Sequence, residues 1–200
     1  MAHGNRLKSL LVAVSAEEEH THDPTLDYAL GLAQEYQSRL TTYVFAPALL
    51  QPFPLTLGSS SVWIAQETDR IETLSGRVAK AIRQRADELG MPVDIEYARS
   101  PFEGRYARFI ALARLHDMTI LETAGTHDAG ARRLAIEHAL FDTGRPGLIA
   151  SHRKFKVPKK VAIAWDGSAQ ASRAIRDGLD LLGKADHVAI ATVVGMKGSE

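Results

Sequence analysis

The sequence predicts an α/β protein, with a five-stranded parallel sheet that carries helices on both faces and is followed by a partial β-α-β unit. Continuous apolar runs rich in branched residues, such as 10–14 and 161–165, are typical of strands buried between two layers of helices. Between these runs, apolar residues recur at helical spacing, so strands and helices alternate along the chain. A length of 200 residues allows one domain, or at most two small ones.

The first three elements make a β-α-β unit. Residues 10–14 are the first strand, and Asp23 and Pro24 then supply a cap and a first-turn proline for a helix that runs to about Tyr36. Residues 40–45 are the second strand, because their β-branched and aromatic side chains favour extended structure. We expect the connection between the two strands to be right-handed, as in nearly all parallel sheets.

A loop and a long helix are predicted next. Residues 46–66 contain three prolines and a Gly-Ser-Ser-Ser cluster, which indicate a loop in which Trp63 is exposed. An amphipathic helix follows over 67–89 and ends at Gly90. The remaining elements alternate in the same way: strand 93–97, helix 105–116, strand 118–121, helix 132–141 and strand 147–150.

Charge and composition exclude several classes of protein. The 24 basic and 24 acidic residues balance, so the overall charge does not favour a nucleic acid or an anionic membrane as a partner. The chain has no cysteine, which excludes disulfides, thiolate metal ligands and thiol nucleophiles. The apolar run at 10–14 is too short for a signal peptide or a membrane span, and we expect a cytoplasmic protein.

The chain is predicted to contain an internal repeat. Residues 151–160, with five basic residues in ten, are predicted to be a linker. After it the opening pattern recurs, with a strand at 161–165, a helix with matching apolar positions and a strand at 188–194. We therefore expect a first domain at 1–150 and the start of a second, similar unit at 161–200. Because a two-stranded unit leaves an open edge, we expect a fragment of a longer tandem protein.

Three features resemble the universal stress protein family in its tandem bacterial form. They are the β/α order, the turn Asp166-Gly167-Ser168 after a buried strand, and the segment Phe141–Pro146 before the last strand of the first domain. The resemblance covers nearly the whole chain and implies a Rossmann-like fold of the adenine-nucleotide alpha hydrolase-like group. It also implies a stress-response protein that binds and regulates and is not an enzyme.

The same family resemblance implies where a nucleotide would bind. In that family the Asp of Asp-Gly-Ser contacts the adenosine part of ATP, and a glycine-rich loop after the fourth strand surrounds the phosphates. The first domain lacks most of this pattern, because Ser15 stands at the Asp position and Glu122 at the first glycine. Only Gly125 of the loop is retained. The Glu122 carboxylate would repel phosphate, so we expect the first domain not to bind ATP in the family's manner.

The second unit retains the part of the pattern that it contains. Asp166, Gly167 and Ser168 are intact, and Val193 stands where the family's second strand contributes an apolar residue beside the adenine. The predicted nucleotide-binding residues are therefore these four and Gly125, with ATP or another adenine nucleotide as the ligand. An alternative interpretation is that Asp166 is a loop residue that caps the following helix.

Partners and other functions remain open at this point. The resemblance implies a homodimer through the last strand of the first domain, made of Gly147, Leu148, Ile149 and Ala150. One alternative function is an ATP-binding protein with slow hydrolysis. Another is a nucleotide-free interaction module whose proline-rich loop at 46–66 contacts a partner protein.

Three motifs that suggest other chemistry are rejected. Residues 178–185 differ by one residue from a phosphate-binding loop, but they lie in a predicted helix and its end, where such a loop does not occur. The acidic segment 17–23 contains two histidines, yet a flexible loop of this kind is a poor metal site, and no metal is predicted. No Gly-x-Ser-x-Gly motif accompanies the serines and eight histidines, so no catalytic residue is assigned.

Overall fold

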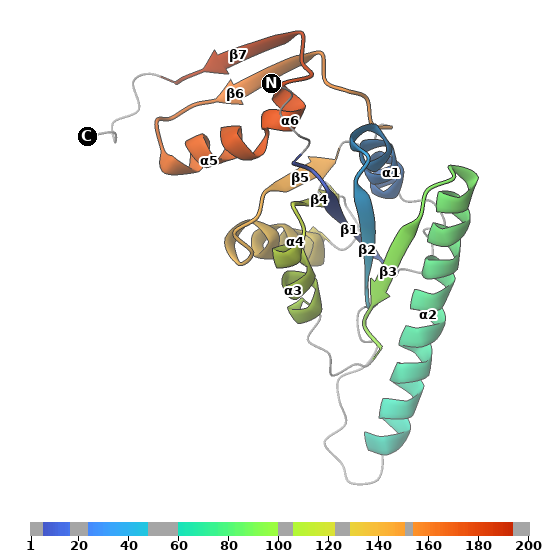
Figure 1. The fold of residues 1–200 in the computed structure, drawn as a ribbon. Helices are drawn as coiled ribbons and strands as arrows, with labels where there is room; N and C mark the ends of the chain where they lie inside the picture. Colours follow the sequence, from blue (N-terminus) through green and yellow to red (C-terminus); the bar gives the residue numbers. More distant parts are fainter. Residues whose placement is uncertain are drawn as a thin grey trace. The chain divides into compact units, whose positions relative to one another are not determined.

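The computed structural model describes residues 6–16, 24–47, 60–99, 106–122, 129–150 and 154–193. The chain forms two compact units (Figure 1): Leu7–Phe155, and a smaller one made of Lys156–Glu200 together with the N-terminal segment Met1–Arg6. The division falls inside the segment predicted to be a linker. The origin of the smaller unit as a repeat of the first stays a prediction.

The larger unit alternates strands and helices as predicted. Its elements are β1 (Ser9–Ser15), α1 (Pro24–Tyr36), β2 (Arg39–Phe45), α2 (Ser60–Glu88), β3 (Val93–Tyr97), α3 (Ala107–Leu115), β4 (Met118–Glu122), α4 (Ala129–Phe141) and β5 (Gly147–Ala150). All four strand pairings are parallel and the order is β3-β2-β1-β4-β5, which confirms the predicted fold class. The chain crosses from one side of β1 to the other between β3 and β4, so β1 and β4 flank the switch point of the sheet.

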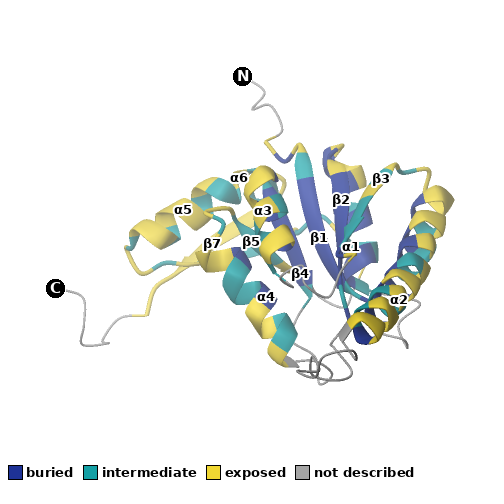
Figure 2. Ribbon diagram, turned by 90° about the horizontal axis from the view of Figure 1, so that it is seen from below, coloured by how far each residue is buried: buried dark blue, intermediate teal, exposed yellow. Residues whose placement is uncertain are grey.

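Helices cover both faces of this sheet. On one face, Phe109 and Ala113 of α3 and Ala139 of α4 pack into a core cluster with side chains from β1, β2 and β4. Helices α1 and α2 lie on the other face (Figures 1 and 2), where the Arg85 Nε of α2 donates to the Asp27 carboxylate of α1 at 2.8 Å. The central strands β1 and β2 are buried almost throughout, because each face of a parallel sheet is covered by helices.

Helix α2 starts one to two turns before the predicted position. Residues 60–66, expected to be a loop, are helical, and Trp63 is buried with 8% of its surface exposed, not exposed as predicted. The buried positions Trp63, Glu67 and Ile71 follow each other at intervals of four, which is the spacing of one helix face. The apolar face of α2 therefore begins before residue 67, where the amphipathic pattern first becomes recognisable in the sequence.

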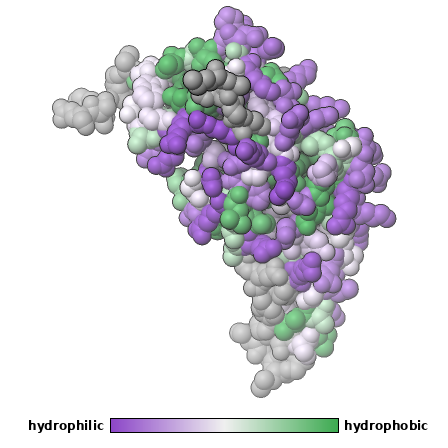
Figure 3. Space-filling model, viewed as in Figure 1, coloured by the Kyte–Doolittle hydropathy of each residue, from purple (hydrophilic) through white to green (hydrophobic). Residues whose placement is uncertain are grey.

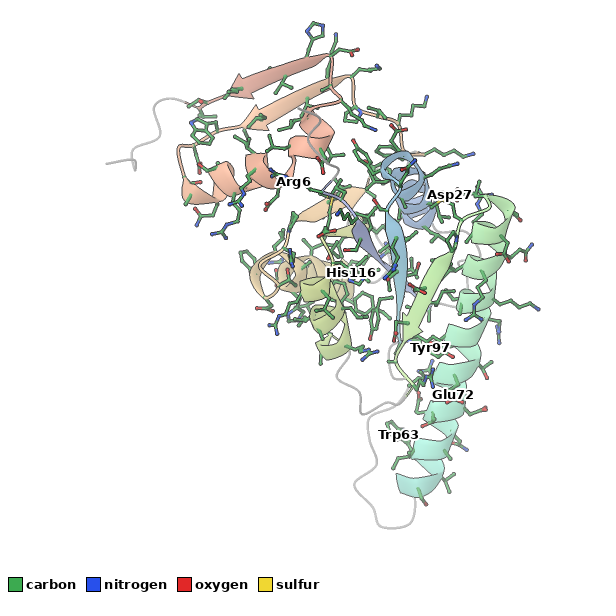
Figure 4. All side chains as sticks on the ribbon, in the orientation of Figure 1. Arg6, Asp27, Trp63, Glu72, Tyr97 and His116 are labelled. Atoms are coloured by element: carbon green, nitrogen blue, oxygen red, sulfur yellow. The ribbon has the colours of Figure 1, made fainter. Side chains whose placement is uncertain are left out.

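Neighbouring threonines of β2 point to opposite faces of the sheet. Thr41 faces α3, where its hydroxyl lies 2.9 Å from Nε2 of the buried His116 (Figure 4), and Nδ1 of the same ring lies 2.7 Å from the Leu112 carbonyl. A carbonyl only accepts, so in the neutral ring Nδ1 carries the proton and Nε2 accepts from Thr41. Thr42 faces the α1 and α2 layer, is fully buried, and its hydroxyl has no hydrogen-bond partner among the described residues.

This contrast predicts opposite effects for the same substitution at adjacent positions. Thr42→Val removes a buried hydroxyl without a partner and should raise the free energy of unfolding by about 1 kcal/mol. Thr41→Val deprives His116 of its donor and should lower it by about 1–2 kcal/mol. Urea unfolding with an unchanged slope measures both. Two changes of the same sign would contradict the assignment of the two hydroxyls.

The smaller unit is a single parallel β-α-β element. Its elements are β6 (Lys160–Ala164), α5 (Ala169–Asp177), α6 (Leu179–Leu182) and β7 (His187–Ala191). The two strands pair from Lys160 with His187 to Ala164 with Ala191. Val188 and Ile190 remain 47% and 67% exposed, and Figure 3 shows apolar surface where Figure 1 labels β6 and β7. The described helices of both units include none long and apolar enough to cross a membrane.

Candidate functional site

A small pocket lies at the switch point of the larger unit, where the carboxyl ends of β1 and β4 diverge. The ends of β1, β2 and β4, Tyr106, and Ala131, Arg132 and Ala135 of α4 line it, and its volume is about 30 Å³. Ligands of open α/β sheets bind at such crevices.

Three of the four polar side chains that line this pocket already have partners within the chain. Arg132 Nε in the first turns of α4 lies 3.2 Å from a Glu122 carboxylate oxygen at the end of β4, and the two side chains are only 16% and 20% exposed. The Tyr106 hydroxyl donates to the Ala131 carbonyl at 3.1 Å. The Ser15 hydroxyl also lines the pocket, is buried, and has no hydrogen-bond partner among the described residues.

The ion pair decides what the pocket offers to a ligand. A guanidinium beside a helix N-terminus attracts an anion, but here a carboxylate of the chain itself takes that position. The sequence-based expectation placed Glu122 at the end of a strand, and it is the last residue of β4. The pairing with Arg132 was missed, because the helix was expected to start at Arg132, whereas α4 starts one turn earlier at Ala129.

Arg132 and its neighbour Arg133 therefore have different environments. Arg133 is 78% exposed and pairs with Glu137 one turn along α4 at 2.8 Å, a surface interaction of low energy. Both arginines look alike in the sequence. The position of the first turn of α4 determines that Arg132 lies in the pocket and Arg133 on the surface.

Glu122→Gln is expected to convert this pocket into a weak anion site. Removal of one negative charge about 4 Å from a bound phosphate removes roughly 1–4 kcal/mol of repulsion. Inorganic pyrophosphate should then bind at least tenfold more tightly than to the unmodified chain, measured by calorimetric or NMR titration.

Glu137→Gln is the matched control, because it removes a carboxylate that pairs with the exposed Arg133 outside the pocket. Equal affinities of the two variants for pyrophosphate would show that Glu122 has no special effect on anions.

The second candidate site is the turn between β6 and α5. The Ser168 backbone N–H donates to the Asp166 carboxylate at 2.9 Å, and the Ser168 hydroxyl oxygen accepts from the Ala171 N–H at 3.0 Å as the helix cap. Gly167 has a φ of +80°, which favours glycine. Ser168, not Asp166, thus caps the helix directly, and Asp166 stabilises the turn that presents it.

The Asp166 carboxylate is exposed and ionised at neutral pH. Hydrogen bonds from the Ser168 hydroxyl and backbone N–H hold the pKa of Asp166 below its usual range. A charged, exposed carboxylate at a strand end accepts hydrogen bonds from hydroxyl or amine donors.

Val193 lies level with Asp166 at the same edge of the two-stranded sheet. Ala164 of β6 pairs with Ala191 of β7, and the Trp165 N–H donates to the Ala191 carbonyl at 2.8 Å. Asp166 and Val193 each come two residues after this pair, one following each strand. Val193 is 77% exposed. The structure therefore places four of the five predicted residues, Asp166, Gly167, Ser168 and Val193, at this edge. Gly125 belongs to the segment 123–128, outside the described residues.

The other motifs offer no competing site. Residues 179–182 form the short helix α6, and the Gly183 N–H donates to the Leu179 carbonyl at 2.8 Å, so the predicted helix end is confirmed and the segment is not a phosphate loop. No group of three or more histidine, aspartate or glutamate residues suited to a metal ion occurs within the described ranges. The acidic segment 17–23 lies outside those ranges.

Comparison with known proteins identifies the fold. No protein-family model and no curated protein matches the sequence. A universal stress protein from Archaeoglobus fulgidus DSM 4304 has a similar structure, with a TM-score of 0.59 and 17% identity over 95% of this chain and 67% of that chain. The chain therefore has the α/β fold of a universal stress protein.

Two further solved structures are less similar. A member of the universal stress protein family from Burkholderia pseudomallei gives a TM-score of 0.43 with 19% identity, over 70% of this chain and 94% of that one. A universal stress protein crystallised in complex with cAMP gives a TM-score of 0.41 with 11% identity, over 72% and 97%.

Proposed function

We propose that this chain is a non-catalytic binding and regulatory protein of the universal stress type, acting in the stress response of the cytoplasm. The observation that carries the proposal is the edge formed by Asp166 and Val193, at the carboxyl ends of two adjacent parallel strands. Carboxyl ends of parallel strands are where open α/β sheets bind ligands. The shared fold with a universal stress protein over 95% of the chain supports the same class.

The proposed ligand is ATP or another adenine nucleotide, held by the smaller unit. The ionised Asp166 would accept hydrogen bonds from ribose hydroxyls, and Val193 would pack against the apolar face of the base. Gly167 leaves the turn open, because no atom lies within 4 Å of the position that a Cβ would take. In this proposal the smaller unit is the start of a second domain in a protein of the tandem kind.

The larger unit favours a second role, as an interaction module without a nucleotide. Its pocket contains a neutral ion pair in place of a free cation, so it provides no unpaired positive charge for a triphosphate. We propose that it instead supports assembly, through a homodimer at Gly147–Ala150. This strand, β5, is the last in the sheet order, and Ile149 on it is 41% exposed.

A charged residue at the β5 edge tests the dimer. Ile149→Lys should raise the dimer dissociation constant at least tenfold, because a lysine on an edge strand opposes pairing with a second strand. Light scattering after size-exclusion chromatography measures the mass of each variant. Val62→Lys, at a 56% exposed position on α2, is the control and should leave the mass unchanged. A monomeric unmodified chain would overturn the proposed dimer.

Titration with a fluorescent ATP analogue tests the nucleotide site. The unmodified chain should bind saturably, and Asp166→Ala should bind at least tenfold more weakly, because the charged acceptor is lost. Asp166→Asn retains a side-chain oxygen for the turn and should also bind weakly, which separates the charge from the folding of the turn. Asp186→Asn removes an exposed carboxylate of the same unit and should bind normally.

The outcomes distinguish the alternatives. Absence of saturable binding to the unmodified chain would reject every nucleotide-based function, including slow hydrolysis, and leave the interaction module. Saturable binding that is the same for Asp166→Ala would retain a nucleotide function and reject this site. Release of phosphate from bound ATP would indicate the slow hydrolase.

A further inference from the structure

An aromatic residue of the linker is docked on helix α1. Phe155 stands between Lys154 and Lys156, in described residues that form neither helix nor strand. Its ring centre lies 5.3 Å from that of Tyr28 at 87° and 6.5 Å from that of Tyr36 at 64°. Both are edge-to-face arrangements, the geometry that aromatic pairs prefer.

A glycine of α1 makes room for this ring. A Cβ placed on Gly31 would lie 3.1 Å from the Cβ of Phe155, closer than ordinary van der Waals contact. Glycine inside a helix is unfavourable compared with other residues, so its presence in the middle of α1 needs a reason. The close approach of Phe155 supplies one. Tyr28, Gly31 and Tyr36 together form a cradle, which we define as the docking surface for Phe155.

Phe155 and its two lysine neighbours have opposite environments. Phe155 is half-buried, whereas Lys154 and Lys156 are exposed. Burial also raises the pKa of the Tyr28 hydroxyl, in keeping with a partly covered phenol. Docking of one half-buried ring orders the chain around it, and this loss of conformational entropy offsets much of the energy gained by burial of the ring. The net free energy of docking is therefore small.

We propose that Phe155 in its cradle is a clasp that sets how much of the linker before β6 is free chain. With the clasp closed, the free chain before β6 is residues 156–159, which spans at most about 14 Å when extended. With the clasp open, the chain from the end of β5 to the start of β6 is residues 151–159 and spans at most about 32 Å. Opening thus more than doubles the longest span of the free chain before β6, and it exposes the peptide bonds beside the two lysines.

Limited trypsin digestion of the full chain measures the clasp, because trypsin cleaves after lysine and arginine. The readout is the initial rate of cleavage after Lys156, followed by mass spectrometry. Phe155→Ala should raise this rate about tenfold, and Phe155→Tyr, which keeps the ring, should restore it to near the original value.

Gly31→Gln is the sharper variant, because it leaves the linker sequence seen by trypsin unchanged. A glutamine side chain at position 31 would displace Phe155 from the cradle, yet glutamine favours a helix more than glycine does. We expect faster cleavage after Lys156 without a lower thermal unfolding midpoint. A merely destabilised α1 would instead lower the midpoint.

Phe141→Ala is the control for loss of an aromatic residue elsewhere. Phe141 is 81% exposed at the end of α4 and has no part in the cradle, so the cleavage rate should stay the same. Cleavage after Arg39, the first residue of β2, requires access to the buried Leu40, so it reports global unfolding and should remain slow in all variants. The clasp would be rejected if Phe155→Ala and Gly31→Gln were cleaved at the original rate, or if Phe141→Ala accelerated cleavage as much.

Discussion

The central strand β1 is the element on which the larger unit depends. It is paired on both edges, with β2 and β4, and its side chains are covered on both faces, so Leu10, Leu11 and Val12 are completely buried. A strand in this position has to satisfy its backbone through two neighbours and its side chains through two layers of helices. The same arrangement makes the chain reverse direction around β1, which creates the crevice at its carboxyl end.

The smaller unit shows what the same local pattern yields without these neighbours. Its strands β6 and β7 pair in parallel around a helical crossover, as β1 and β2 do. No residue of α5 is buried, however, and the β-branched residues Val188 and Ile190 remain exposed. Pairing and turn formation are local events, whereas burial needs further strands and helices against each face.

The two candidate sites differ in charge for a physical reason. At the end of β4, Glu122 and Arg132 neutralise each other inside a small pocket, so the field that an anion meets there is weak. At the end of β6, the carboxylate of Asp166 is held in its ionised form by Ser168 and faces solvent. The first is therefore a neutral crevice, and the second presents a charged acceptor at the same sheet edge as an apolar side chain. This difference is why the proposed ligand is assigned to the smaller unit.

The sequence by itself determined the alternation of strands and helices, the strand-end positions of Ser15 and Glu122, and the turn at Asp166, because these follow from periodicity and local hydrogen bonding. Only the tertiary structure decided the partners of distant residues. Thr41 bonds to His116, 75 positions away, and Phe155 docks on α1 beside Gly31. Arg132 meets Glu122 because α4 begins one turn earlier than its apolar pattern indicates. Such contacts depend on how layers pack and where a helix starts, and the spacing of residues along the chain predicts neither.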